Sequence, residues 1–231
     1  MHKFFIVITV LLSFSSYSFA SNVSKADPYV MIEEAAQITF DRFAREETEI
    51  KKNPEILKDI VREELMPYIS YKYASLKVLG SHAKKAQRAD VLAFMEAFKE
   101  YLITSYAQVF TLYNKQQVIF EPDKKIDKQK IVFVGVDIID GDRPPINIKF
   151  KVRKFAQKDS NGKFSHYDWE AFDLVAEGIS LLDAKQKELR SILAQNGVVK
   201  VTEMLKEKSE RKIVFSDAIS VQGQLDAQDK N

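Results

Sequence analysis

The chain has 231 residues, of which 45% are hydrophobic, and a formal net charge of +2. This near-neutral charge argues against a nucleic-acid partner, because such binding needs a concentrated basic surface. The absence of cysteine excludes a disulfide scaffold and a lipoprotein anchored through an N-terminal Cys.

The first twenty residues, 1–20, have the features of a secretory signal peptide. Lys3 supplies the positive start, Phe4 to Leu12 form the apolar run, and Ser18-Phe19-Ala20 is a small-x-small cleavage site. The apolar run is too short to span a bilayer. We therefore expect an exported periplasmic protein whose mature chain begins near Ser21.

Three helices are predicted before residue 80, over residues 28–47, 54–65 and 69–79. Asp27 and Asn53 each precede a proline, which is a typical helix start, and Gly80 provides a stop for the third helix. The first half of the mature chain is therefore expected to be helical.

The longest amphipathic run extends from Gln87 to Tyr113. Apolar residues recur there at i, i+3, i+4 and i+7, and neither Gly nor Pro interrupts them. The apolar side includes six aromatic residues, with Phe98 near the middle. A central helix is predicted, and its aromatic face must be covered by the rest of the protein, by a partner or by an apolar ligand.

From Gln117 the apolar period changes to that of β-strands. Strands are predicted over 117–121, 130–140, 146–153 and 164–175, the third with strict apolar and polar alternation. Turn-forming residues separate them, as expected for antiparallel neighbours.

Two further helices are predicted, from Ser180 to Gly197 and over 198–208, because Ser180 and Asp183 form a capping-box signal. The fold class is therefore α+β, a curved antiparallel sheet of about four strands with helices over one face. One domain is expected over residues 21–215, followed by a polar and disordered tail at 216–231.

Few residues of this chain point to catalysis. His82 and His166 have no neighbours at metal-ligand spacing, and there is no nucleophile elbow or phosphate-binding glycine loop. Asp173 interrupts the apolar end of a strand, where it can accept structural hydrogen bonds or act as a general base. We expect no catalytic centre, metal or cofactor.

A series of short motifs in a fixed order resembles the MlaC family, periplasmic phospholipid-binding proteins also called the toluene-tolerance family. The resemblance extends from about Asp27 to Lys208, and its specificity lies in the number and order of the motifs. These are Asp27-Pro28-Tyr29, Ala35-Ala36-Gln37, Thr39-Phe40-Asp41-Arg42, Glu64-Leu65, Pro67-Tyr68, Lys72-Tyr73-Ala74, Val78-Leu79-Gly80, Ala97-Phe98, Glu100-Tyr101-Leu102, Ser105-Tyr106-Ala107, Ile138-Ile139-Asp140, Arg143-Pro144-Pro145, Trp169, Ala171, Asp173, Ala176-Glu177-Gly178 and Lys185-Gln186.

The resemblance implies an NTF2-like fold with an apolar pocket for the acyl tails of a glycerophospholipid. It also implies exchange of that lipid with MlaD of an inner-membrane ABC transporter and with an outer-membrane MlaA-porin complex, which together maintain outer-membrane lipid asymmetry. A monomer is expected.

The residues predicted to contact lipid are apolar or aromatic and lie on the expected helices and strands. They are Tyr73, Leu79, Phe94, Phe98, Leu102, Tyr106, Phe110, Val134, Val136, Ile148, Phe150, Phe172, Leu174 and Ile179. Core packing is the alternative for each of them, because pocket lining and core share one composition.

Two other functions remain open on the sequence. One is a periplasmic enzyme of NTF2-like fold that acts on an apolar substrate with Asp173 as base. The other is a chaperone for hydrophobic polypeptides. The enzyme requires Asp173 to face the cavity with a raised pKa, and the chaperone requires a long open groove.

Overall fold

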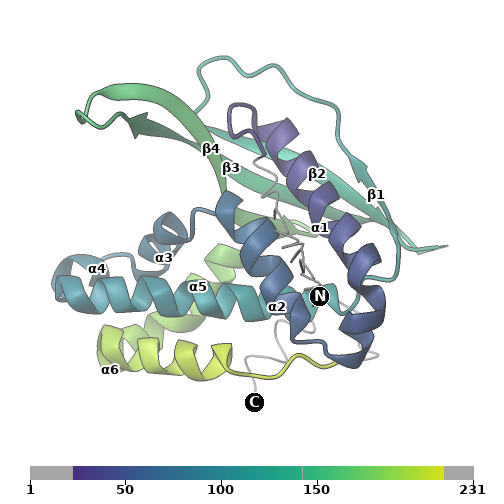
Figure 1. The fold of residues 1–231 in the computed structure, drawn as a ribbon. Helices are drawn as coiled ribbons and strands as arrows, with labels where there is room; N and C mark the ends of the chain where they lie inside the picture. Colours follow the sequence, from purple (N-terminus) through teal and green to yellow (C-terminus); the bar gives the residue numbers. More distant parts are fainter. Residues whose placement is uncertain (1–22, 142, 216–231) are drawn as a thin grey trace, which may run out of the picture.

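The computed structural model describes residues 23–141 and 143–215. The predicted signal peptide and the tail at 216–231 lie outside the described residues. In chain order the elements are α1 (Pro28–Lys52), α2 (Ile56–Ile60), the π-helical η1 (Val61–Leu65), the 3-10 helix η2 (Met66–Tyr68), α3 (Tyr71–Leu79), α4 (His82–Lys85), α5 (Arg88–Phe110), β1 (Gln117–Phe120), β2 (Ile131–Ile139), β3 (Ile146–Lys158), β4 (Phe164–Ala176), β5 (Ile179–Ser180) and α6 (Leu181–Ser209) (Figure 1).

The strands form one antiparallel sheet in the order β1-β2-β3-β4-β5. The predicted α+β class and antiparallel sheet are confirmed, and the two-residue strand β5 adds a fifth member at one edge. A register shift between Lys151 and Val152 leaves Phe172 as an extra residue of β4, and such bulges increase the local bend of a strand. Figure 1 shows the long β3–β4 ribbon curving away from the helices.

The helix boundaries follow local capping chemistry. Asp27 accepts hydrogen bonds from the backbone N–H groups of Tyr29 (2.8 Å) and Val30 (3.2 Å), which starts α1. Gly197 lies at φ 74° and ψ 179° inside α6 and divides it into two helical segments. Because an L-residue other than Gly is strained at such angles, the predicted break at Gly197 follows directly from the residue type.

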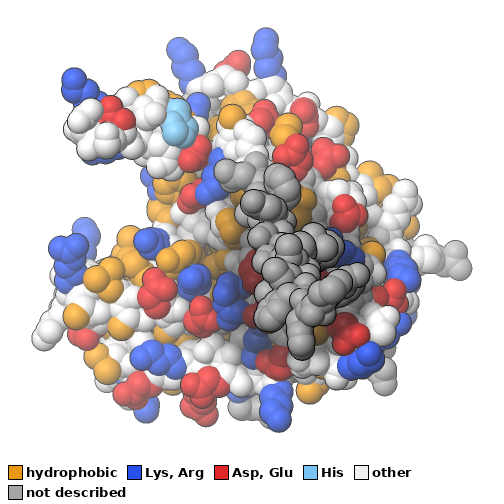
Figure 2. Space-filling model, in the orientation of Figure 1, with side chains coloured by type: hydrophobic (Ala, Val, Ile, Leu, Met, Phe, Trp, Pro, Cys, Tyr) orange, Lys and Arg blue, Asp and Glu red, His pale blue; other side chains and the backbone are white. Residues whose placement is uncertain are grey.

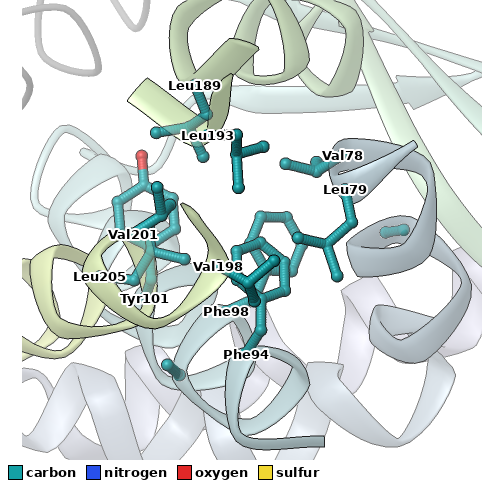
Figure 3. Packing of buried hydrophobic residues seen from close by; sticks show 12 residues of the cluster. Val78, Leu79, Phe94, Phe98, Tyr101, Leu189, Leu193, Val198, Val201 and Leu205 are labelled. Carbon is teal, nitrogen blue, oxygen red and sulfur yellow. The ribbon is translucent and has the colours of Figure 1, made fainter. Parts of the chain in front are cut away.

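The side chains of α5 pack with α3 and α6 in a helical core (Figure 3). Phe94 and Phe98 stack with ring centroids 5.9 Å apart, and they are 0% and 1% exposed. The labelled members of this core are Val78, Leu79, Phe94, Phe98, Tyr101, Leu189, Leu193, Val198, Val201 and Leu205.

Two further clusters complete the apolar interior. In the sheet cluster, Met31, Ile32 and Ala35 of α1 pack on one face of the sheet around Val134 and Trp169. In the α1–α5 cluster, the second half of α1 packs with α2, η1 and the second half of α5 around Phe43, Ile60, Ile103 and Ala107. The apolar interior of the described chain is thus divided into three clusters, and Ile69 packs against both the sheet cluster and the α1–α5 cluster.

The central helix is held by other helices. In the described chain, the elements that α5 packs against closely are α6, α3, α2 and η1, and no strand is among them. In the space-filling view, an open hollow lies between the projecting end of the β3–β4 ribbon and the helices below it (Figure 2). None of the helices within 23–141 and 143–215 has the length and apolarity to cross a bilayer.

The burial of Phe98 in the helical core predicts the effect of shortening its side chain. Because its ring is enclosed on all sides, Phe98→Ala should lower the free energy of unfolding by about 3–5 kcal/mol in urea denaturation. Phe133→Ala is the matched control, since Phe133 is 48% exposed on β2 and should change stability by less than about 0.5 kcal/mol. A loss for Phe98→Ala no larger than that of the control would show that the ring is not sealed in this core.

Candidate functional site

Apolar side chains form two rows across the face of the sheet that α1 contacts. Strand register aligns Val134, Phe150 and Leu174 in one row and Val136, Ile148 and Ala176 in the next. The row that ends at Ala176 belongs to none of the three clusters, and neither does Leu174. Val136 and Ala176 in these rows are buried, whereas Ile148, Phe150 and Leu174 are only partly buried.

The second half of α5 supplies further apolar side chains. Leu102 borders the helical core, whereas Tyr106 and Phe110 border the α1–α5 cluster, and all three are only partly buried. Phe150 borders the sheet cluster in the same way. We define the inner apolar patch as Leu102, Tyr106, Phe110, Val136, Ile148, Phe150 and Leu174.

Tyr106 is the polar member of this patch. Burial raises the pKa of its hydroxyl above the ordinary value, and the negative charge of Asp173 adds to the shift. No described residue forms a hydrogen bond with this hydroxyl. Ser105 Oγ is a fully buried polar atom that lacks a hydrogen-bond partner, and the Tyr106 oxygen does not belong to that group. The hydroxyl therefore stays protonated at neutral pH and is free to donate to a bound acceptor.

The fourteen predicted lipid contacts remain a prediction, but the structure separates them by position. Seven form the inner apolar patch, and Val134 lies beside it in the sheet cluster. Leu79, Phe94 and Phe98 lie in the helical core, where protein side chains surround them (Figure 3).

The other three predicted contacts lie elsewhere. Tyr73 of α3 meets Phe172 of β4, with ring centroids 5.1 Å apart, and Ile179 is 51% exposed in β5. These residues are not grouped with the inner apolar patch.

Two residues near the patch were not among the predicted contacts, Ile138 and Ala176. Ile138 follows the alternation of β2 onto the same face as Val134 and Val136, so its sequence pattern was sufficient to find it. Ala176 is placed only by the register of β4 against Ile148. Its small side chain carries no pattern of its own.

A separate groove of about 250 Å³ lies between α5 and the end of α6. Glu96, Glu100 and Glu210 line it together with Lys206. Carboxylates at this density suit water and cations better than hydrocarbon, so the groove is not a site for acyl tails.

Asp173 is held on both carboxylate oxygens. Its Oδ2 accepts from Ser180 Oγ (2.6 Å) and lies 2.7 Å from Lys151 Nζ, while Oδ1 accepts from the Leu182 N–H (3.0 Å). The side chain is 1% exposed. A general base needs an oxygen free to receive a substrate proton, so this geometry favours the structural role. In the described chain, no three His, Cys, Asp or Glu residues are grouped as metal ligands would be.

Comparisons with known proteins identify the family and the fold that this chain resembles. The family described as MlaC protein matches residues 33–207. A Haemophilus influenzae protein, the intermembrane phospholipid transport system binding protein MlaC, is 28% identical over 217 residues, which are 94% of this chain and 97% of that protein.

A solved structure has the same fold. The phospholipid-binding protein from Ralstonia solanacearum, in complex with a phospholipid, superposes with a TM-score of 0.65 at 16% identity. The match covers 80% of this chain and 100% of that one.

The contacts of Asp173 predict a stability effect. Asp173→Asn keeps the volume but removes the charge that Lys151, Ser180 and Leu182 share, so unfolding should become easier by about 1.5–3 kcal/mol in urea denaturation. The control is Asp140→Asn, whose pair with Arg143 is more exposed and should contribute less than about 1 kcal/mol. Equal stability of Asp173→Asn and wild type would contradict the proposed structural role.

Proposed function

The chain belongs to the MlaC family, and from this premise we propose that it is a soluble periplasmic carrier for one glycerophospholipid. The acyl tails lie against the inner apolar patch. The observation that carries the proposal is the patch itself, an apolar region bordered by three packed clusters but belonging fully to none.

A magnitude explains why such a carrier must enclose the tails. A two-tailed lipid exposes roughly thirty methylenes, and at about 0.8 kcal/mol each their transfer through water costs on the order of 20 kcal/mol. A tail-binding site needs shape and apolarity but few polar groups. The head group remains in water.

The single polar atom of the patch fits this ligand. The protonated hydroxyl of Tyr106 donates a hydrogen bond to an ester carbonyl of the glycerol backbone, at the boundary between tails and head group. Its raised pKa keeps the hydroxyl neutral beside the hydrocarbon.

The family relationship supports a place in a transport route. The Haemophilus influenzae relative is named as part of an intermembrane phospholipid transport system. By extension, this chain exchanges lipid with MlaD of the inner-membrane ABC transporter and with the MlaA-porin complex, and thereby maintains outer-membrane asymmetry. It is not an enzyme in this scheme, and Asp173 is structural.

The first test is the ligand content of the purified protein. Protein prepared without detergent should contain about one glycerophospholipid per chain by mass spectrometry, because apolar side chains are unfavourable to leave in contact with water. A folded, lipid-free protein that takes up no phospholipid from vesicles would contradict the proposal.

A paired substitution then tests the position of the pocket. Ile148→Asp places a charge beside the acyl tails and should remove most bound lipid, while circular dichroism still shows a folded protein. Phe133→Asp is the matched control, because Phe133 lies on the opposite face of the sheet and is 48% exposed. Full lipid content in a folded Ile148→Asp protein would place the tails elsewhere.

A further inference from the structure

The tip of the β3–β4 ribbon exposes an aromatic pair. Phe164 and Tyr167 are 57% and 48% exposed, and their ring centroids lie 4.8 Å apart. Lys154 lies over the Tyr167 ring at 4.8 Å, and Lys158 and Lys163 flank the turn. Large aromatic side chains seldom face water in pairs without a partner.

The corner formed by α3, α4 and the start of α5 is strongly basic. Residues 70–89 contain Lys72, Lys77, Lys84, Lys85 and Arg88 and no acidic residue. All five side chains are exposed, and within the described chain none has a carboxylate at ion-pair distance. The corner also exposes Leu76 and Leu92, at 40% and 49%.

Elsewhere on the helices, cations are mostly paired. Arg42 binds Glu46, Glu63 and Glu64, and Lys51 pairs with Glu47. The unpaired positive charge of the α3–α4 corner is therefore a local feature. It cannot be recognised from the net charge of the whole chain, which is only +2.

The ribbon tip and the α3–α4 corner project from the same side of the molecule (Figure 1). The space-filling view shows basic side chains at the ends of both projections, with the hollow between them (Figure 2). Tyr73 of α3 connects the two, because Arg153 of β3 lies 4.2 Å from its ring centroid and Lys77 lies 5.8 Å from it.

The chemistry of this surface matches an anionic lipid bilayer better than an acidic protein. Lysine predominates over arginine here, whereas protein interfaces are depleted in lysine and enriched in arginine. Lysines close to exposed aromatic and aliphatic side chains are the pattern of interfacial membrane binding, in which charges meet head groups and apolar groups enter the boundary layer.

We propose that the ribbon tip and the α3–α4 corner form a docking surface for the head-group layer of an anionic phospholipid membrane. The surface is distinct from the inner apolar patch. It depends on exposed side chains and does not require a lipid in the proposed pocket.

Vesicle flotation tests the proposal. The wild-type protein should float with vesicles of phosphatidylcholine and phosphatidylglycerol at low salt, and far less with phosphatidylcholine alone or at high salt. The triple variant Lys84→Glu, Lys85→Glu, Arg88→Glu should bind about a hundredfold more weakly. The double variant Phe164→Ser, Tyr167→Ser should bind vesicles more weakly than the wild type at every salt concentration, because it loses an apolar contribution that salt does not screen.

Matched controls alter the same properties elsewhere. Arg45→Glu, Lys51→Glu, Lys52→Glu makes the same charge change at the far end of α1, where the three side chains are 66–67% exposed. Ile131→Ser, Phe133→Ser removes exposed apolar groups from β2. Both controls should bind vesicles almost as the wild type does.

Two outcomes would overturn the proposal. One is a wild-type protein that ignores anionic vesicles at low salt but binds polyglutamate, which would assign the surface to an acidic protein partner. The other is an equal loss of binding in the α1 control. Mass spectrometry of bound phospholipid in each variant separates this surface from the carrier function, because docking and lipid content should change independently.

Discussion

A buried carboxylate joins the two layers of this protein. Asp173 on β4 accepts hydrogen bonds from Ser180 and Leu182, and Ser180 in turn accepts from the Asp183 N–H at 3.0 Å, so the start of α6 is held against the sheet. Lys151 balances the charge from the neighbouring strand. The position of α6 then determines that of α5, because the two helices share the helical core.

This arrangement explains why the central helix and the sheet do not close on each other. On one side the layers are connected through Asp173, and on the other the first half of α1 belongs to the sheet cluster and its second half to the α1–α5 cluster. The remaining inner face, with Ile148 and Leu174, has no clustered partner.

The proposed carrier and the proposed docking surface make different demands on the chain. The proposed carrier requires an apolar surface that excludes water, with one neutral polar group, the hydroxyl of Tyr106. The ribbon tip and the α3–α4 corner carry unpaired lysines and exposed aromatic rings. The lysines repel one another and the rings contact water, so neither feature favours folding. Features that do not favour folding are the ones most informative about function.

The sequence by itself determined the elements and the family. The period of apolar residues located α5 and the long strands, capping residues located the starts of α1 and α6, and Gly197 marked a break because few other residues adopt its backbone angles. Family resemblance rested on ordered motifs, which are local in the chain.

Only the tertiary structure decided which apolar residues pack and which remain available. Phe98 and Tyr106 follow the same helical period, but they have different neighbours. Phe98 is enclosed by side chains of α3 and α6, whereas Tyr106 borders the α1–α5 cluster and retains a free hydroxyl. Periodicity identifies an apolar face, but burial depends on residues that are distant in sequence and brought together by the fold.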